Sequence, residues 1–160
     1  MTIKVGDKIP SATLKTMTGD GPEDVSTDEF FKGRKVVLFG VPGAFTPGCS
    51  KQHLPGFVQS ADAIKAKGVD AVACVAVNDV FVMGAWSEAQ GAGGKVTLLA
   101  DGSGVFARVL GLEFDLTERG LGVRSRRYAM VVDDGRVSTF HLEDGPGVSV
   151  SSVENLLNDL

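Results

Sequence analysis

Short apolar runs alternate with amphipathic stretches along this chain. Four of the runs are bounded by turn residues and are almost entirely apolar, which is typical of buried strands. They span residues 36–41, 69–77, 96–100 and 128–132. After the last run, Asp133-Asp134-Gly135 predicts a hairpin turn that leads into a return strand over 137–142. A further short strand is expected over 12–16, ahead of the turn signal at 18–22.

Apolar residues at helical spacing follow the first of these strands. The stripe consists of Leu54, Phe57, Val58, Ala61 and Ile64, with Gly68 in the cap position beyond its end. Pro55 lies inside the stripe and predicts a kink, because proline cannot donate the backbone hydrogen bond that a helix needs there. The sequence therefore predicts a long helix that begins near residue 47 and bends early.

Three further helices are expected. Asn78 or Asp79 can cap a helix that carries Met83 and Trp86, and a short helix over 105–110 should close at a glycine. Near the C-terminus, Ser151 and Glu154 predict a capping box in front of an apolar stripe over 153–160. Residues 112–123 mix charge and glycine, and we interpret them as a surface loop. The alternation of strands and helices predicts an α/β fold with a mixed central sheet flanked by helices.

Composition narrows the class of protein. The 160 residues suit one domain over 1–160 with a sizeable core, and a net charge of −4 argues against a nucleic-acid surface. Residues 1–5 carry no signal-peptide core, and no apolar stretch is long enough for a membrane span, so neither a membrane nor nucleic acid is expected as a partner. Two cysteines argue against a disulfide-stapled secreted scaffold and favour a cytoplasmic protein. No metal or other cofactor is expected, since one Cys and one His lack a second pair spaced for zinc.

The candidate reactive residues lie just after the end of the first buried strand. Pro42, Gly43, Pro47 and Gly48 define a loop, and Thr46-Pro47 is a strong helix-start signal that puts Cys49 in the first turn. A sulfur placed there lies near unpaired N–H groups and the positive end of the helix dipole, which can lower a cysteine pKa from its free value of roughly 8.5. The alternative is a small buried core residue, but a core cysteine does not need two prolines and two glycines before it.

These residues resemble a known family. The segment VPGAFTPGCS, followed by HLPGF, is similar to the active-site segment of peroxiredoxins, and its residues resemble those of the type II or peroxiredoxin 5 subfamily. The signature Pro-x-x-x-Thr-x-x-Cys is met by Pro42, Thr46 and Cys49, and the resemblance extends over nearly the whole chain. It implies a thioredoxin-like fold and a thiol-dependent peroxidase that reduces hydrogen peroxide and alkyl hydroperoxides through a sulfenic acid. A dithiol oxidoreductase or redox chaperone on the same fold is the alternative, as is a non-catalytic interaction module; the absence of Cys-x-x-Cys counts against the dithiol enzyme.

The resemblance also assigns roles. Cys49 becomes the nucleophile, Thr46 a hydrogen-bonding partner of the peroxide or sulfur, and Pro42 and Gly48 parts of the peroxide site. An arginine just before an apolar strand is expected to point at the thiolate, and Arg127 occupies that place. Arg124 is the rival, although it lies an odd number of residues away and should face the opposite side of a straight strand.

The remaining assignments concern His53, the second thiol and the partners. His53 lies four residues after Cys49, on the same helical face, and we expect a supporting role. Cys74 sits among Ala and Val and is interpreted mainly as core, while the resemblance also makes it a possible second thiol. An external reductant is therefore expected: glutathione with glutaredoxin, or thioredoxin. The type II resemblance also implies a homodimer.

Overall fold

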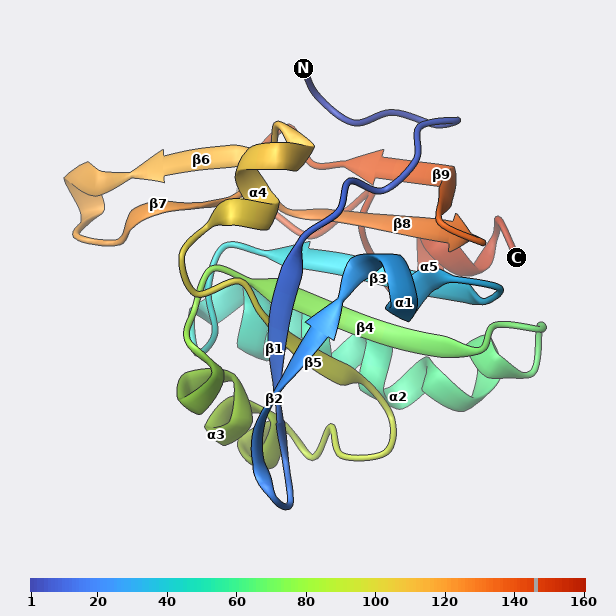
Figure 1. The fold of residues 1–160 in the computed structure, drawn as a ribbon, viewed down its shortest axis with the longest axis horizontal. Helices are drawn as coiled ribbons and strands as arrows, with labels where there is room; N and C mark the ends of the chain where they lie inside the picture. The colour runs from blue at the N-terminus through green and yellow to red at the C-terminus, as the bar shows by residue number, and fades with distance from the viewer. Residues whose placement is uncertain (146) are drawn as a thin grey trace.

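The computed structural model describes residues 1–145 and 147–160. Seven strands form its main sheet: β1 (Thr13–Thr18), β2 (Gly21–Ser26), β3 (Lys35–Val41), β4 (Ala71–Ala76), β5 (Thr97–Ala100), β8 (Tyr128–Asp133) and β9 (Arg136–Leu142). Across the sheet they lie in the order β2-β1-β5-β4-β3-β8-β9 (Figure 1). The three central strands β3, β4 and β5 are parallel, whereas β1 and β8 run antiparallel to their neighbours. The predicted mixed sheet and its four buried strands are therefore confirmed.

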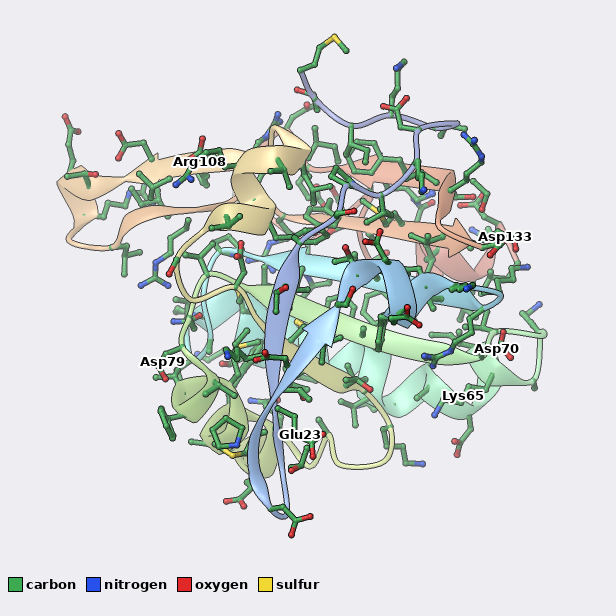
Figure 2. The ribbon with its side chains drawn as sticks, viewed as in Figure 1. Glu23, Lys65, Asp70, Asp79, Arg108 and Asp133 are labelled. Carbon is green, nitrogen blue, oxygen red and sulfur yellow. The ribbon has the colours of Figure 1, made fainter. Side chains whose placement is uncertain are left out.

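Helices connect the strands and cover both faces of the sheet. They are α1 (Thr27–Phe31), the π-helical turn η1 (Cys49–His53), α2 (Leu54–Lys65), α3 (Val80–Gln90), α4 (Val105–Leu110) and α5 (Val153–Leu157). Asp79 caps α3 by accepting a hydrogen bond from the Val82 amide, and Gly111 closes α4 in the left-handed conformation. Figure 2 shows Asp79 at the start of α3 and Lys65 at the end of α2, both on the periphery of the molecule. The capping and closing signals in the sequence thus predicted these ends correctly.

The sheet separates two apolar clusters. One lies between the sheet and α2, α3 and α5, and it contains both cysteines together with Phe39, Phe57 and Trp86. The other lies under α1, α4 and the N-terminal segment, and it includes Phe106 and Tyr128. Both cysteines are free thiols. The first cluster matters for function, because the candidate nucleophile is part of it.

The prediction of a surface loop over 112–123 is wrong. This stretch contains β6 (Glu113–Leu116), the 3₁₀ turn η2 (Thr117–Arg119) and the first half of β7 (Gly122–Ser125), and the two strands form a separate antiparallel hairpin. In Figure 1 the hairpin extends sideways from the main sheet, and Figure 2 shows Arg108 of α4 beside β6. The β6 residues Glu-Phe-Asp-Leu do alternate polar and apolar, but this strand signal is only four residues long and lies among charged residues and glycines, which favoured the loop interpretation.

Two smaller predictions also need correction. The turn is tighter than the predicted 18–22, because Thr18 at the end of β1 already pairs with Gly21 at the start of the edge strand β2. Pro22 is tolerated in β2 because an edge strand leaves one side unpaired. The capping residue of α5 is Ser152, whose side chain accepts a hydrogen bond from the Asn155 amide. Ser151 points inward instead and binds Glu143.

Candidate active site

The candidate nucleophile lies just after the carboxyl end of β3. The helical backbone begins at Pro47, as predicted, and the Ser50 amide donates to the Thr46 carbonyl over 2.9 Å. From Cys49 to His53 the turn is π-helical, because the Leu54 amide bonds to the Cys49 carbonyl five residues back. Pro55 follows directly and has no N–H to continue the ladder. The expected early irregularity is therefore present as a wide turn that contains the cysteine, a feature frequent at functional sites.

The loop before the helix is held by polar contacts. The Ala44 amide donates to the Asn78 side chain over 2.9 Å, and Phe45 adopts a positive φ of 65°, which is uncommon for a residue other than glycine. The Thr46 hydroxyl donates to the Gly43 carbonyl over 2.6 Å instead of capping a helical amide. Since a carbonyl can only accept, the proton of this hydroxyl is engaged there. The oxygen lone pairs of Thr46 are left to accept a hydrogen bond from a ligand.

Arg127 contacts the sulfur of Cys49. Its Nη2 donates to Sγ over 3.3 Å, and both residues are buried. A guanidinium in that position stabilises negative charge on the sulfur. The Nε of Arg127 is buried and has no hydrogen-bond partner among the residues that the structure describes. Gly48 makes room for this side chain, because a Cβ there would lie 3.0 Å from Nη2.

His53 lies on the other side of the same guanidinium. Its Nδ1 is 3.1 Å from Arg127 Nη1, and its Nε2 is 2.9 Å from the Ser151 carbonyl oxygen. Burial, followed by the Arg127 charge, lowers the pKa of His53 to about 3, against smaller opposing effects of Ser151 and Glu143. The ring is therefore neutral at physiological pH, which suits the expected supporting role.

Arg124 is near the site without touching the sulfur. Its Nε donates to the Leu121 carbonyl over 2.8 Å, and its Nη1 donates to the Pro42 carbonyl over 3.3 Å. These bonds tie β7 to the loop before Cys49. Of the two candidate arginines, Arg127 is the one that lies against the nucleophile.

Cys74 is buried in the middle of β4, opposite Phe39 of β3. Burial raises the pKa of this thiol well above its usual value; the nearby Cys49 adds to the rise and Arg127 opposes it. Its surroundings are those of a core residue. A direct attack on an oxidised Cys49 would require Cys74 to lose a proton in an apolar environment.

A cavity of about 530 Å³ opens over the Cys49 loop. Pro42, Thr46, Gly48 and Arg127 contribute to its wall, together with apolar side chains of the β6–β7 region: Phe114, Leu116 and Leu121. This cavity therefore reaches the residues that surround the sulfur. Pro42 and Gly48, the residues expected to border the peroxide site, both line this cavity.

The partners that hold these residues come from parts of the chain that the sequence does not connect with the site. Glu143 and Ser151 come from beyond β9, and no motif or spacing indicates that they reach the helix of Cys49. The apolar wall from β6–β7 was also missed, because that region was interpreted as a loop. Two signals pointed to it: the short polar–apolar alternation of residues 113–116, and the presence of Phe114, Leu116 and Leu121 in a glycine-rich, charged stretch.

Neither a metal site nor a membrane span is found in the described part of the chain. No group of three or more His, Cys, Asp or Glu side chains is placed there to hold a metal ion. None of the helices over 1–145 and 147–160 has the length and apolar character to cross a bilayer.

Comparisons with known proteins agree with this geometry. Residues 4–157 match the family model described as Redoxin. The chain is 54% identical to Peroxiredoxin-2E-2, chloroplastic, of Oryza sativa subsp. japonica, over 99% of this chain and 73% of that protein. Reduced Prx3 of Vibrio vulnificus, solved in complex with hydrogen peroxide, superposes with a TM-score of 0.95 at 49% identity over 99% of both chains. Peroxiredoxin 5 of Alvinella pompejana gives a TM-score of 0.86 at 36% identity, over 98% of this chain and 96% of that one.

These matches span almost the whole chain, and they show that it has the thioredoxin-like fold of peroxiredoxins. The chain belongs to the Redoxin family and is a peroxiredoxin of the type II, or peroxiredoxin 5, group.

Proposed function

We propose that this thiol-dependent peroxidase reduces hydrogen peroxide and alkyl hydroperoxides at Cys49, with Arg127 and Thr46 holding the peroxide. The observation that carries the assignment is the 3.3 Å contact between Arg127 Nη2 and the Cys49 sulfur, beside a buried Nε without a partner among the described residues. A peroxide oxygen next to the sulfur would accept from that Nε. The Thr46 oxygen, whose own proton is bound to Gly43, would accept the peroxide proton.

The reaction then follows from charge movement. The Cys49 thiolate attacks the terminal oxygen of the peroxide, an S–O bond forms and the O–O bond breaks. The electron pair leaves with the second oxygen, which takes up a proton to become water or an alcohol. Arg127 contacts the Cys49 sulfur, which carries the negative charge at the start of the reaction, and its guanidinium stays positively charged throughout. The product is the sulfenic acid of Cys49, which two thiol equivalents return to the thiol with release of water.

The cavity supports organic peroxides as substrates. Its volume of about 530 Å³ and its apolar wall, formed by Phe114, Leu116 and Leu121, suit a hydrocarbon group attached to the distal oxygen. Hydrogen peroxide needs only the polar end of this cavity. We therefore expect the alkyl group to contribute to binding without touching Cys49.

An external thiol completes the cycle in this proposal. The raised pKa of Cys74 and its position in the core make it a poor resolving thiol. We expect that external thiol to be glutathione with glutaredoxin, or thioredoxin. A reducing compartment such as the cytoplasm would supply either system and would keep both cysteines free.

We further propose a homodimer that packs through the loops beside the active site. Phe45 and Phe81 are 54% and 67% exposed, and the Phe45 ring lies 6.5 Å from the buried Trp86 ring. Large apolar side chains that are exposed beside a functional loop favour a second copy as their cover. Sedimentation of the wild-type protein and of Phe81→Ser at micromolar concentration tests this; a wild-type monomer would contradict it.

Peroxide consumption with dithiothreitol as reductant tests the main proposal. Turnover of hydrogen peroxide and of an alkyl hydroperoxide is the expected result. Insulin disulfide reduction without peroxide turnover would instead indicate the dithiol oxidoreductase, and neither activity would indicate an interaction module. Repeating the assay with glutathione plus glutaredoxin, and with thioredoxin, identifies the reductant.

A further inference from the structure

The C-terminal segment reaches the active site through one buried side chain. His53 is completely enclosed and spans the gap between Arg127 and the backbone of Ser151. The Ser151 carbonyl can only accept, so His53 Nε2 must carry the ring proton. Nδ1 is then the acceptor for Arg127 Nη1. The two contacts fix one tautomer and leave the ring no other hydrogen-bonding capacity.

Glu143 holds the segment from the other side. Its Oε2 accepts from the Ser149 amide, the Ser151 amide and the Ser151 hydroxyl over 2.7–2.8 Å, and its Oε1 accepts from the Ser149 hydroxyl over 2.8 Å. Burial alone would raise the pKa of Glu143, but these bonds outweigh it and lower the pKa to about 2. The carboxylate is therefore charged and saturated, and it fixes the carbonyl that His53 binds.

Packing completes the attachment. Val153 lies over Gly56 of α2, where an added Cβ would come within 3.2 Å of its methyl group, and Leu156 is fully buried in the same cluster as Cys49. The start of α5 is thus seated on α2 one turn after His53. A shift of this segment would move the Ser151 carbonyl and, with it, the acceptor of Arg127.

We propose that Glu143, the Ser151 carbonyl and His53 form a positioning relay that orients Arg127 against the Cys49 sulfur, so that the docking of residues 149–157 controls the oxidation rate of Cys49. The relay rests on the proposed role of Arg127. A purely structural role would predict that breaking the network lowers stability and leaves the chemistry of the remaining folded protein unchanged.

Two substitutions of His53 separate these roles. His53→Phe keeps a ring in the pocket and removes both contacts, whereas the His53→Asn amide oxygen can still accept from Arg127. We expect His53→Phe to slow stopped-flow oxidation of Cys49 by about tenfold to a hundredfold, the effect of losing a hydrogen bond to a charged group. His53→Asn should retain a rate between that of His53→Phe and wild type. Equal rates in His53→Phe and wild type, or no rescue by His53→Asn, would overturn the relay.

A charge test on Glu143 provides an independent readout. If Glu143 acted only as a negative charge, Glu143→Gln would favour the Cys49 thiolate, and its ultraviolet titration would move to lower pH. The relay predicts the opposite, a midpoint at higher pH and slower oxidation, because Arg127 loses its orientation. Glu154→Gln, which removes an exposed charge from the first turn of α5, is the matched control and should leave both unchanged.

A midpoint that moves to lower pH in Glu143→Gln would overturn the proposal. Thermal unfolding of each variant shows how much folded protein is present. If Glu143→Gln does not fold, the comparison of His53→Phe with His53→Asn still tests the relay. Failure of the relay is distinguishable from failure of the proposed function, since the latter would leave the wild-type protein itself without peroxide turnover.

Discussion

Cys49 and Cys74 lie in the same apolar cluster and are equally inaccessible, yet their surroundings differ in kind. Cys49 lies in the first turn of a helix, in a π-helical segment, and its sulfur accepts a hydrogen bond from Arg127. Cys74 lies in the middle of β4, between two parallel neighbours, and the main influence on its thiol is burial. Burial therefore does not distinguish a reactive cysteine from a structural one in this protein.

The charged contact distinguishes them. Cys49 lies near the buried guanidinium of Arg127, the hydroxyl of Thr46 and the neutral ring of His53. His53 in turn accepts a hydrogen bond from Arg127. Around Cys74 the chain places aliphatic strands. Reactivity in this protein therefore depends on a few polar groups that the fold places beside Cys49 and not beside Cys74.

The largest expected effect comes from the nucleophile itself. Cys49→Ser should abolish peroxide reduction, because an unactivated hydroxyl is a far poorer nucleophile than a thiolate. The measurement is peroxide consumption with dithiothreitol, compared with the reductant alone. Turnover above that background would mean that Cys49 is not the essential nucleophile.

The next effect concerns the cation. Arg127→Gln should slow oxidation of Cys49 at neutral pH by roughly a hundredfold or more, the usual cost of losing a buried donor to a transition-state charge. Part of the loss should persist at high pH, where the sulfur is fully ionised, because the contact with the peroxide is also missing.

Arg124→Gln is the matched control for the cation. Arg124 binds the Leu121 and Pro42 carbonyls, not the sulfur, so a smaller effect is expected from a slightly looser loop. Stopped-flow oxidation of both variants across pH compares them. A larger loss in Arg124→Gln would mean that Arg127 does not act as the principal cation.

Local signals predicted the part of the site that is contiguous in sequence. The apolar run of β3, the Thr46-Pro47 helix start and the position of Cys49 can all be found without coordinates. Arg127 could be assigned only through the family resemblance, because its alignment with the sulfur depends on the pairing of β8 with β3. That pairing is a long-range contact which periodicity does not encode.

The rest of the site had little local signal. Ser151 looked like a helix cap, yet the cap is Ser152 and Ser151 turns inward to Glu143, a choice that depends on how α5 packs against α2. The Thr46 hydroxyl bonds to Gly43 because the loop folds back on itself. The β6–β7 hairpin was missed because each of its strands is four residues long, so the alternation in β6 does not stand out from the charged residues and glycines around it.

Acid should expose a further difference, because the groups that serve Cys49 titrate and those around Cys74 do not. The unfolded chain binds a proton at His53 near pH 6.5, whereas the folded protein does so only near pH 3. At Glu143 the corresponding values are about 4.5 and about 2. In both cases the unfolded state binds more protons between the two values, so stability is fully present above pH 6.5 and is lost as the pH falls.

Denaturant unfolding measured between pH 7 and pH 4.5 tests this acid sensitivity. The His53 proton alone predicts a slope of up to about 1.4 kcal/mol for each pH unit. In His53→Asn the free energy of unfolding should change less steeply with pH, because the amide does not titrate and the contribution of the His53 proton is lost. An unchanged slope in His53→Asn would mean that His53 is accessible to protons in the folded state, contrary to its burial.

The smallest effect on activity is expected at Cys74. Cys74→Ser should leave turnover with glutathione and glutaredoxin within about twofold of wild type, because nothing in the proposed cycle passes through this thiol. Its stability should fall by about 1–3 kcal/mol, since the substitution places a hydroxyl among aliphatic side chains. Non-reducing mass spectrometry of the peroxide-treated wild-type protein should show no dominant Cys49–Cys74 disulfide. If that disulfide were the main product, Cys74 would be the resolving thiol, and the apolar surroundings that separate it from Cys49 would have to open during each cycle.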